Sequence, residues 1–404
     1  MGLRILDIDF DSQTHQEKLY DLYTKLHSSS PIFMDRKGDI YLSKYADCRR
    51  LLREKIFVHR LEKDAPLYPP GEAGSAAMEE MIRPWMICAD PPEHARLRSV
   101  LGDTLAPRSI NMLLSDIRVI ALGYIERLPV GQVFDFIEQF ARPFPITVMS
   151  QVLGIPLDHP DLEKIPRWTH SISMAFDRQS TTEDIELAEP AVHAFRRFVD
   201  ELLALPEIRA GDGALGAMLN LYKTGKFSYE EIAYGLMLVI GASHGNIRSM
   251  LSSGLLLLLT NPSQLDRFCS RVDLSGALVE EILRVESPVQ RFGRWASEDC
   301  RFGDTFIERG RFITALIGAA NRDPAVFEAP NAFRIEREPN EHLSFGKGIH
   351  LCSGFHLARV EGRIAFERLH PLLPRMELLD FEWNGWSEDR SFRSLKRLNV
   401  KINE

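Results

Sequence analysis

One cysteine of this sequence has surroundings suited to holding a metal ion through its thiolate. Cys352 lies in the segment LSFGKGIHLCSGFHLARVEGR, residues 343–363, where glycines crowd around it and an amphipathic helical pattern follows at once. Glycine tolerates tight and left-handed turns, so the backbone can approach a ligand closely. A helix that starts near Gly354 would direct its N-terminal N–H groups toward the sulfur and favour the thiolate. The alternative is a buried structural cysteine in a glycine-rich loop.

The other four cysteines indicate no disulfide framework and no zinc site. Cys48, Cys88, Cys269 and Cys300 are widely spaced, and no C-x-x-C pair occurs, a pattern that suits a reducing compartment. The chain has 404 residues, 45% of them hydrophobic, and a net charge of −8. These values describe an ordinary soluble protein and argue against nucleic acid as the main partner. The acidic N-terminal segment has no long apolar run, so we expect no signal peptide, no membrane anchor and a cytoplasmic location.

The periodicity of the apolar residues predicts a mainly helical chain with small β-sheets. The most apolar stretch, residues 234–260, contains His244 and Arg248. It therefore predicts a long buried helix with a second helical piece after it, and no membrane span. Further helices are predicted over residues 91–106, 275–288 and 355–374, and strands over residues 39–45, 311–318 and 399–403. No internal repeat or clear linker occurs, so we expect one domain over residues 1–404.

The segment Phe345–Gly354 reads F-G-x-G-x-H-x-C-x-G and resembles the haem-binding loop of the cytochromes P450. The family's E-x-x-R helix is matched by Glu281 and Arg284, whose side chains lie on one face of a helix. The later stretch FRIER supplies Arg337, the third member that the family joins to this pair. The resemblance covers about residues 40–404 and is that of a bacterial-type member without a membrane anchor.

The resemblance implies the α+β fold of that family, a large helical domain with small sheets. Haem b (iron protoporphyrin IX) would lie between the central long helix and the cysteine loop, with Cys352 as the axial ligand of the iron. His94 and Arg98, one helical turn apart in ADPPEHARLR, would bind a haem carboxylate by charge-assisted hydrogen bonds. The haem contacts that the resemblance implies are His94, Arg98, Arg294, Phe345, Gly346, His350 and Gly354.

The sequence departs from the family pattern in the central helix. Typical members carry A-G-x-(E/D)-T, whose acid and alcohol relay protons for oxygen activation, whereas this chain reads ASHGN from Ala242 to Asn246. Gly245 replaces the acid and cannot carry a proton, and the amide of Asn246 is a poor acid or base near neutrality. Glycine within a helix costs about 1 kcal/mol relative to alanine. We therefore expect a widened groove or a ligand contact at the catalytic positions Ala242, Gly245 and Asn246, and a helix contact for His244.

Three mechanisms are open at this point. In the first, Asn246 and ordered water replace the proton relay of a monooxygenase. In the second, a group on the substrate supplies the proton path. In the third, the enzyme catalyses oxidative coupling, nitration or a peroxide-driven oxidation. A non-catalytic haem sensor or binding protein is the alternative outside enzymes. The main prediction is a monooxygenase of secondary metabolism that activates O2 to oxidise a medium-sized, largely apolar or aromatic small molecule.

The resemblance also implies partners and substrate contacts. Electrons would come from NAD(P)H through a ferredoxin reductase and a ferredoxin, which would dock near Lys347, Arg359 and Arg363. The protein is expected to be a monomer with neither a membrane nor a nucleic acid as partner. Substrate contacts are expected from the loop 60–87, the helix around 238–246, the segment Val289–Gly293 and the turn Ser391–Phe392, and in particular from Trp85, Met86, Leu238, Val289, Phe292 and Phe392.

Overall fold

The computed structural model describes residues 3–8, 18–62, 75–102, 104–177, 180–211, 213–379, 386 and 392–404. The chain forms two compact units, each assembled from separate segments. The first unit comprises Met1–Leu61, Ser115–Phe144 and Asn246–Glu404, and the second unit comprises Glu62–Leu114 and Pro145–Gly245. The single domain expected over residues 1–404 stays a prediction.

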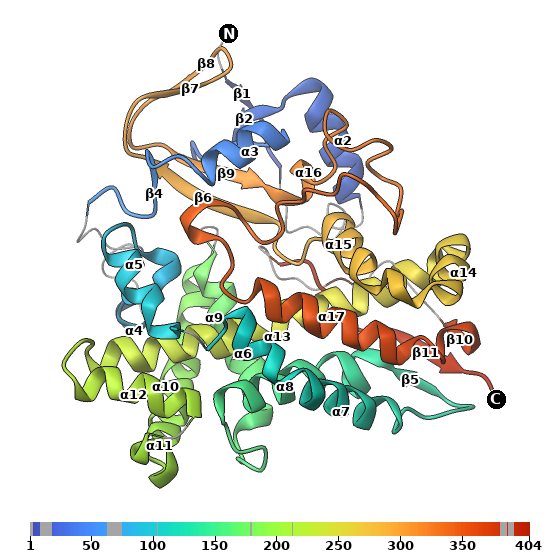
Figure 1. Ribbon diagram of the computed structural model, residues 1–404. Helices are drawn as coiled ribbons and strands as arrows, with labels where there is room; N and C mark the ends of the chain where they lie inside the picture. Colours follow the sequence, from blue (N-terminus) through green and yellow to red (C-terminus); the bar gives the residue numbers. More distant parts are fainter. Residues whose placement is uncertain are drawn as a thin grey trace. The chain divides into compact units, whose positions relative to one another are not determined.

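Among the described residues, the first unit holds three β-sheets, of which a mixed six-stranded sheet is the largest (Figure 1). Its strands, in spatial order, are β1 (Arg4–Ile5), β2 (Ile32–Met34), β3 (Ile40–Leu42), β9 (Phe312–Leu316), β6 (Arg291–Ala296) and β4 (Phe57–Val58). The other two sheets have the strand orders β10 (Met376–Leu378), β11 (Asn399–Ile402), β5 (Val133–Asp135) and β7 (Cys300–Phe302), β8 (Thr305–Ile307). The strands predicted over residues 39–45, 311–318 and 399–403 are confirmed as β3, β9 and β11.

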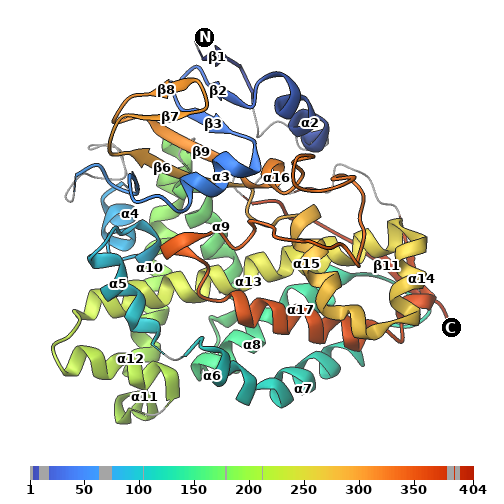
Figure 2. The same cartoon turned by 45° about the horizontal axis from the view of Figure 1, so that its top comes forward.

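Strand β9 lies inside the six-stranded sheet, between β3 and β6 (Figure 2). It pairs in parallel with β3 and antiparallel with β6. Ile313 and Ala315 of β9 are fully buried, and they share one apolar core with Leu42 of β3 and Ala296 of β6. A strand covered on both faces is expected to be mainly apolar, and β9 is apolar except for the buried Thr314. This buried strand fixes the position of β6, which carries two of the predicted site residues.

Helix α17 packs closely on its neighbours in the first unit. A Cβ atom added to Gly362 of α17 would lie 2.7 Å from the Cε of Met250 and 2.9 Å from a Cγ of Val279. The side chains of Met250 and Val279 therefore pack directly on the backbone of α17 at this glycine. The helices of this unit are α2 (Leu19–Ser29), α3 (Tyr45–Leu51), α7 (Leu114–Ile125, whose first residue belongs to the second unit), α14 (Pro262–Ser270), α15 (Ser275–Val285), α16 (Ile317–Ala320) and α17 (Phe355–Leu369).

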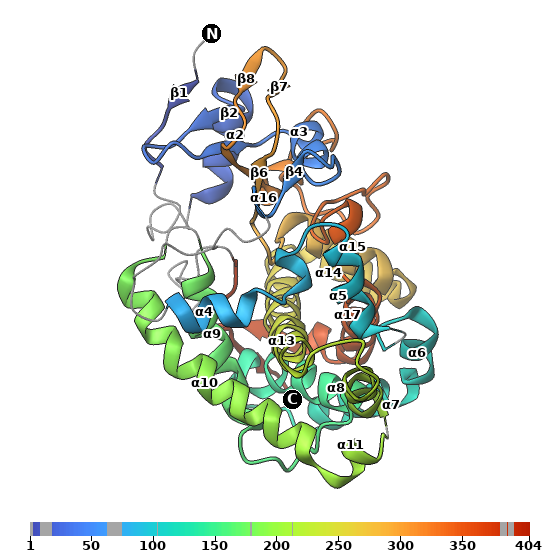
Figure 3. The same cartoon turned by 90° about the vertical axis from the view of Figure 1, so that its left-hand side faces the viewer.

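The second unit is built around the packing of α9 (Ile165–Phe176) on α10 (Thr182–Ala204), which lie side by side in Figure 3. The rings of Trp168 and Phe195 stack between these two helices with their centroids 5.7 Å apart. Thr181 and Asp184 form a capping box that fixes the start of α10. The other helices are α4 (Ser75–Ile82), α5 (Glu93–Arg98), α6 (Pro107–Met112), α8 (Pro143–Leu153, which begins in the first unit), α11 (Pro206–Ala210) and α12 (Gly213–Lys223).

Helix α13 runs without a break from Tyr229 to Thr260 and contributes residues to both units. Helix α14 follows it, so the predicted long helix and the second helical piece are confirmed. Most side chains of α13 are buried, as the apolar sequence predicts. Across the part of the chain that the structure describes, no helix is both long and apolar enough to cross a membrane.

Three predicted helices end earlier than expected, each for a local reason. The helix predicted over residues 91–106 is interrupted, because α5 ends at Arg98 and a 3-10 turn leads to Gly102, whose φ of 45° cannot continue a helix. The helix predicted over residues 275–288 ends at Val285, since the residue before Pro288 is biased away from helical geometry. The helix predicted over residues 355–374 ends at Leu369, two residues before Pro371.

Candidate functional site

The cysteine loop, defined as residues 345–354, is closed by its own backbone. The N–H of Cys352 donates to the carbonyl oxygen of Phe345 at 2.9 Å, and the N–H of Gly346 donates to that of Leu343 at 2.8 Å. Gly346 and Gly348 have φ values of 70° and 74°, a left-handed conformation that other residues rarely adopt. Gly346 and Gly348 therefore shape this turn as predicted.

The sulfur of Cys352 lies beside the N-terminus of α17. Gly354 is the N-cap residue of this helix, and a Cβ atom added to it would be 4.0 Å from the Cys352 Sγ. Among the five cysteines, all of which the structure describes, Cys352 alone is exposed in the protein chain. The alternative of a buried structural cysteine is therefore wrong. An accessible thiol at a helix N-terminus is well placed to act as a thiolate.

The other cysteines have the opposite surroundings. Burial raises the pKa of the thiols of Cys48, Cys269 and Cys300, and Cys88 is buried as well. A thiol with a raised pKa is a poor source of thiolate near neutral pH. Cys352 is therefore the candidate metal ligand among the five cysteines, because it alone is exposed.

Two further contacts hold the cysteine loop within the first unit. A Cβ atom added to Gly348 would lie 2.5 Å from the Leu52 carbonyl oxygen and 3.2 Å from the Arg53 Cα, so this glycine packs directly on the segment after α3. The ring of His350 meets that of His59 at 65°, with 4.5 Å between their centroids. Loop and sheet are thus connected through residues close to β4.

The residues predicted to bind the haem carboxylates belong to both units. His94 and Arg98 lie one turn apart on α5 in the second unit, and His94 is buried. Arg294 is buried on β6 and His350 is half-buried in the cysteine loop, both in the first unit. The spacing predicted for His94 and Arg98 is therefore present, and the joint role of the four residues stays a prediction.

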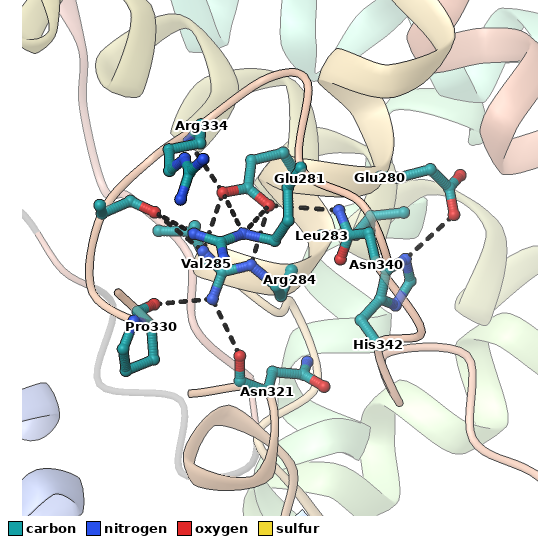
Figure 4. A network of polar contacts seen from close by, with 12 residues as sticks. Glu280, Glu281, Leu283, Arg284, Val285, Asn321, Pro330, Arg334, Asn340 and His342 are labelled. Atoms are coloured by element: carbon teal, nitrogen blue, oxygen red, sulfur yellow. Dashed lines mark hydrogen bonds and ion pairs between the residues drawn. The ribbon is translucent and has the colours of Figure 1, made fainter. Parts of the chain in front are cut away.

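The Glu281 carboxylate is the centre of a buried polar network, as Figure 4 shows. The Arg284 guanidinium binds both of its oxygens at 2.8 Å, and Arg337 Nε lies 3.1 Å from each oxygen. The side chains of Glu281 and Arg284 have no exposed surface. Asn340 Nδ2 and the backbone N–H of Arg334 donate to the same carboxylate at 3.2 and 2.8 Å. The predicted triad of Glu281, Arg284 and Arg337 is thus brought together.

This network reaches the cysteine loop through Asn321. Arg284 donates to the Asn321 carbonyl oxygen at 3.0 Å. The side chain of Asn321 then accepts the N–H of Leu343 at 2.7 Å and donates to the hydroxyl of Ser344 at 2.9 Å. Ser344 in turn donates to the Leu283 carbonyl oxygen at 2.6 Å. The two residues that precede the loop are consequently fixed by buried hydrogen bonds.

The ASHGN stretch leaves one face of α13 open. Ala242 is exposed, and a Cβ atom added to Gly245 would meet no atom within 4 Å. Ala242, Gly245 and Asn246 share one helix face, because they are three or four residues apart. His244 points elsewhere: its Nε2 lies 3.1 Å from the Thr169 hydroxyl of α9, as predicted, and its Nδ1 lies 3.1 Å from the Ile240 carbonyl oxygen.

Two of the predicted substrate contacts are joined by the backbone. Val289 and Phe392 form an isolated antiparallel bridge, and the N–H of Arg393 donates to the Pro288 carbonyl oxygen at 2.8 Å. Ser249 of α13 donates to the Arg393 carbonyl oxygen. Phe292 lies elsewhere in the first unit, against Gly346, whose added Cβ would be 3.9 Å from its ring. Ser391 lies outside the described residues.

The remaining predicted substrate contacts lie in the second unit. Trp85 is buried, and its indole N–H donates to the Tyr234 carbonyl oxygen of α13 at 3.0 Å. Met86 is half-buried and Leu238 is buried. The sequence interpretation missed Phe176, whose ring lies 5.6 Å from that of Trp85 and is 37% exposed. Its position at the end of α9 could not be read from a short motif. Residues 63–74 of the predicted loop lie outside the described residues.

The three predicted docking residues differ in their surroundings. Arg359 makes a two-point ion pair with Glu280, at 2.6 and 2.8 Å. Arg363 lies 3.7 Å from Glu367 in a partly exposed pair. Lys347 is half-buried within the cysteine loop. The role of Glu280 was also missed, since a second acidic residue next to Glu281 reads as an ordinary solvated side chain.

Comparison with known proteins identifies the relatives of this chain. The family model for cytochrome P450 matches residues 269–370. The chain is 30% identical over 391 residues to a biotin biosynthesis cytochrome P450 of Bacillus subtilis (strain 168), covering 94% of this chain and 95% of that protein. It is also 30% identical over 369 residues to the polyketide biosynthesis cytochrome P450 PksS of the same organism, covering 90% and 89%. The crystal structure of P450BioI in complex with a hexadec-9Z-enoic acid-ligated acyl carrier protein has a TM-score of 0.87 at 28% identity, over 96% of this chain and 100% of that one.

Removal of one guanidinium from the buried network should destabilise the first unit. Arg284→Ala leaves the Glu281 carboxylate without its two-point partner, and breaking a buried ion pair in this way costs about 3–5 kcal/mol. Arg267→Ala is the matched control, because Arg267 pairs with Glu336 on the exposed surface and its loss should leave stability near that of the unaltered protein. Urea unfolding followed by circular dichroism measures both variants. Equal midpoints for the two would contradict the structural role of Arg284.

Proposed function

This chain belongs to the cytochrome P450 family, and from that premise we propose that Cys352 is the axial ligand of a haem b with which the enzyme oxidises a medium-sized, largely apolar or aromatic molecule. The family makes the chain a monooxygenase with haem iron as its cofactor, and thus an oxidoreductase. The alternative of a non-catalytic haem sensor is set aside on this ground. The observation that carries the proposal is the exposed Cys352 thiol at the N-terminus of α17.

The residues of the loop fit the thiolate side of a haem site. A thiolate ligand needs an accessible sulfur, a favourable local potential and hydrogen bonds that fix its backbone, and Cys352 has all three. Bound haem supplies the one-electron and dioxygen chemistry of the reaction. We assign Phe345, Gly346 and Gly354 to the haem side of the loop. His94, Arg98, Arg294 and His350 are the proposed donors to the haem carboxylates.

Relatives support an apolar substrate of biosynthetic origin. Two are named for biotin and polyketide biosynthesis, and P450BioI is crystallised with an acyl carrier protein that bears a hexadecenoic acid. In this chain the proposed substrate contacts are also largely apolar: Trp85, Met86, Leu238, Val289, Phe292 and Phe392, to which we add Phe176. A screen of spectral shifts against fatty acids and polyketide fragments tests this class, and binding of polar compounds alone would contradict it.

We propose that dioxygen is activated at the side of α13 that is lined by Ala242, Gly245 and Asn246. The exposure of Ala242 and the open space beside Gly245 support a groove there. Neither Gly245 nor Asn246 can pass a proton as a carboxylate does. A water molecule or a substrate group held by the Asn246 amide would then complete the proton path. The lack of a proton-carrying side chain at Gly245 and Asn246 also favours a second candidate, an enzyme of oxidative coupling, nitration or peroxide-driven oxidation.

Electrons would come from NAD(P)H through a ferredoxin reductase and an acidic ferredoxin in the cytoplasm. The proposed docking surface includes Lys347, Arg359 and Arg363. Arg359 and Arg363 have acidic neighbours of their own, so part of their charge is neutralised. Arg53 strengthens the surface, because it is exposed and its backbone lies directly against Gly348 of the cysteine loop. We therefore add Arg53 to the proposed contacts of an acidic electron donor.

The ligand assignment predicts a change of absorption spectrum, and the assignment of the carboxylate contacts predicts a change in the rate of haem release. Cys352→Ser should lose the long-wavelength absorption band of the reduced, carbon-monoxide-bound protein, because that band requires a thiolate ligand, whereas Cys269→Ser should keep it. Arg98→Ala should keep the band but release haem to apomyoglobin faster than Arg108→Ala does, since a charge-assisted hydrogen bond is worth about 1.5–3 kcal/mol. Arg108 is exposed on α6 and serves as the charge-matched control. A band that persists in Cys352→Ser would refute the assignment of the ligand.

The altered relay predicts an effect on coupling. Asn246→Ala should lower product formed per NAD(P)H consumed, and raise peroxide release, while haem content stays unchanged. The double substitution Gly245→Glu with Asn246→Thr restores the usual family pair. It should not improve turnover of the native substrate, because the added carboxylate would fill the groove beside Gly245. If the restored pair raises coupled turnover instead, the departure from the family has no function in the reaction.

The docking surface predicts a dependence on charge and salt. Arg53→Glu should slow the second-order reduction by an acidic ferredoxin about two- to fivefold, since reversing a rim charge costs up to about 1 kcal/mol. The effect should shrink as ionic strength rises. Arg309→Glu makes the same change at an exposed residue after β8 and should leave the rate unaltered. Stopped-flow mixing measures both, and equal slowing in the two variants would argue for a general effect of net charge.

A further inference from the structure

A charged cluster joins α15 and α17 beside the cysteine loop. Glu280 of α15 accepts hydrogen bonds from Nε and Nη2 of Arg359 of α17, at 2.6 and 2.8 Å. His342 contributes a third contact, with its Nε2 at 3.2 Å from a Glu280 oxygen. All three residues belong to the first unit. None of these contacts is needed for the buried Glu281 network, so the cluster requires its own explanation.

The guanidinium of Arg359 is held over two rings at the cysteine loop. Its Cζ lies 4.6 Å from the ring centroid of Phe345 and 5.4 Å from that of Phe355. A cation over an aromatic face is attracted by the ring quadrupole. The backbone carbonyl of Phe345 accepts the N–H of Cys352 at 2.9 Å. One residue therefore links the positive charge of Arg359 to the backbone of the proposed ligand.

The carboxylate that holds Arg359 is ionised throughout the neutral range. Burial alone would raise the pKa of Glu280, but hydrogen bonds from Arg359 and His342 outweigh it and lower that pKa to about 2. The imidazole of His342 is oriented by the backbone N–H of Ser344, which donates to its Nδ1 at 3.3 Å. The N–H at Nε2 then faces Glu280. The cluster thus pairs the ionised Glu280 carboxylate with the Arg359 guanidinium.

We propose that Arg359 and Glu280 set, with opposite signs, the reduction potential of the iron that Cys352 binds. They act through the cysteine loop, with whose Phe345 ring Arg359 is in contact. Reduction adds negative charge to the site, which a nearby cation stabilises and a nearby anion destabilises. Arg359 contacts the ring of Phe345, and Glu280 contacts Arg359 and His342. The pair is partly exposed, with 37% and 28% of the side-chain surface accessible, so solvent reduces but does not remove the effect. This inference rests on the proposed haem ligation and adds a role for Arg359 beyond docking.

The test measures midpoint potentials of the haem-loaded protein by dye-mediated titration, without any partner protein. Arg359→Gln should shift the potential to more negative values, and Glu280→Gln should shift it to more positive values. The double variant should lie near the unaltered protein, because it removes both charges. Arg368→Ala removes the same charge from the exposed last turn of α17 and should cause no shift. Arg359→Lys keeps the charge and should recover part of the difference.

The carbon-monoxide spectrum separates this inference from the proposed function. If the unaltered protein has no long-wavelength band, the haem ligation itself fails. If all variants keep the band and the two single variants shift in opposite directions, the charge role is established. Shifts of both single variants in the same direction would show a merely structural role and overturn the proposal. Unchanged potentials in both would overturn it as well.

Discussion

The buried carboxylate of Glu281 holds together the part of the first unit that supports the cysteine loop. Its side chain has no exposed surface. Two guanidinium groups, an amide and a backbone N–H converge on it. A buried charge is tolerated only when such partners surround it, and it then defines one arrangement of the chain. Arg284 donates a hydrogen bond to the Asn321 carbonyl oxygen, and the side chain of Asn321 bonds to Leu343 and Ser344. These buried hydrogen bonds consequently fix the two residues that precede the cysteine loop.

The central helix meets a different constraint. A 32-residue helix that is apolar almost throughout must bury most of its surface, and α13 does so, although Ala242 of the ASHGN stretch is exposed. There the side chains become small, and Ala242 and Gly245 leave space. Glycine within a helix costs about 1 kcal/mol relative to alanine, so Gly245 makes this part of α13 less favourable as a helix. One face of α13 packs on α9 through His244 and Thr169, while another face has open space beside Gly245.

Local sequence patterns predicted much of the fold and the cysteine loop. The glycines of the loop act through backbone geometry, and the pair Glu281 and Arg284 acts through helical spacing, so both can be recognised along the chain. Strands β3, β9 and β11 followed from short apolar runs. What could not be predicted is set by contacts between distant segments. The pairing of Glu280 with Arg359 spans α15 and α17, and the contact of Phe176 with Trp85 depends on where α9 ends. Helix ends were also missed where a glycine or proline outweighed the apolar pattern, as at Gly102.

Strand β11 has a consequence for the synthesis of this protein. It pairs with β5 through Val400 and Phe134, and the N–H of Leu398 donates to Asp135 across 263 positions of the sequence. Contacts of such separation close slowly, because a long loop must first be brought together. The segment before β11 also bridges Val289 and binds Ser249. A nascent chain that has not yet emerged beyond Asn399 lacks these contacts. The sheet of β10, β11 and β5 therefore cannot close before the segment up to Ile402 has been synthesised.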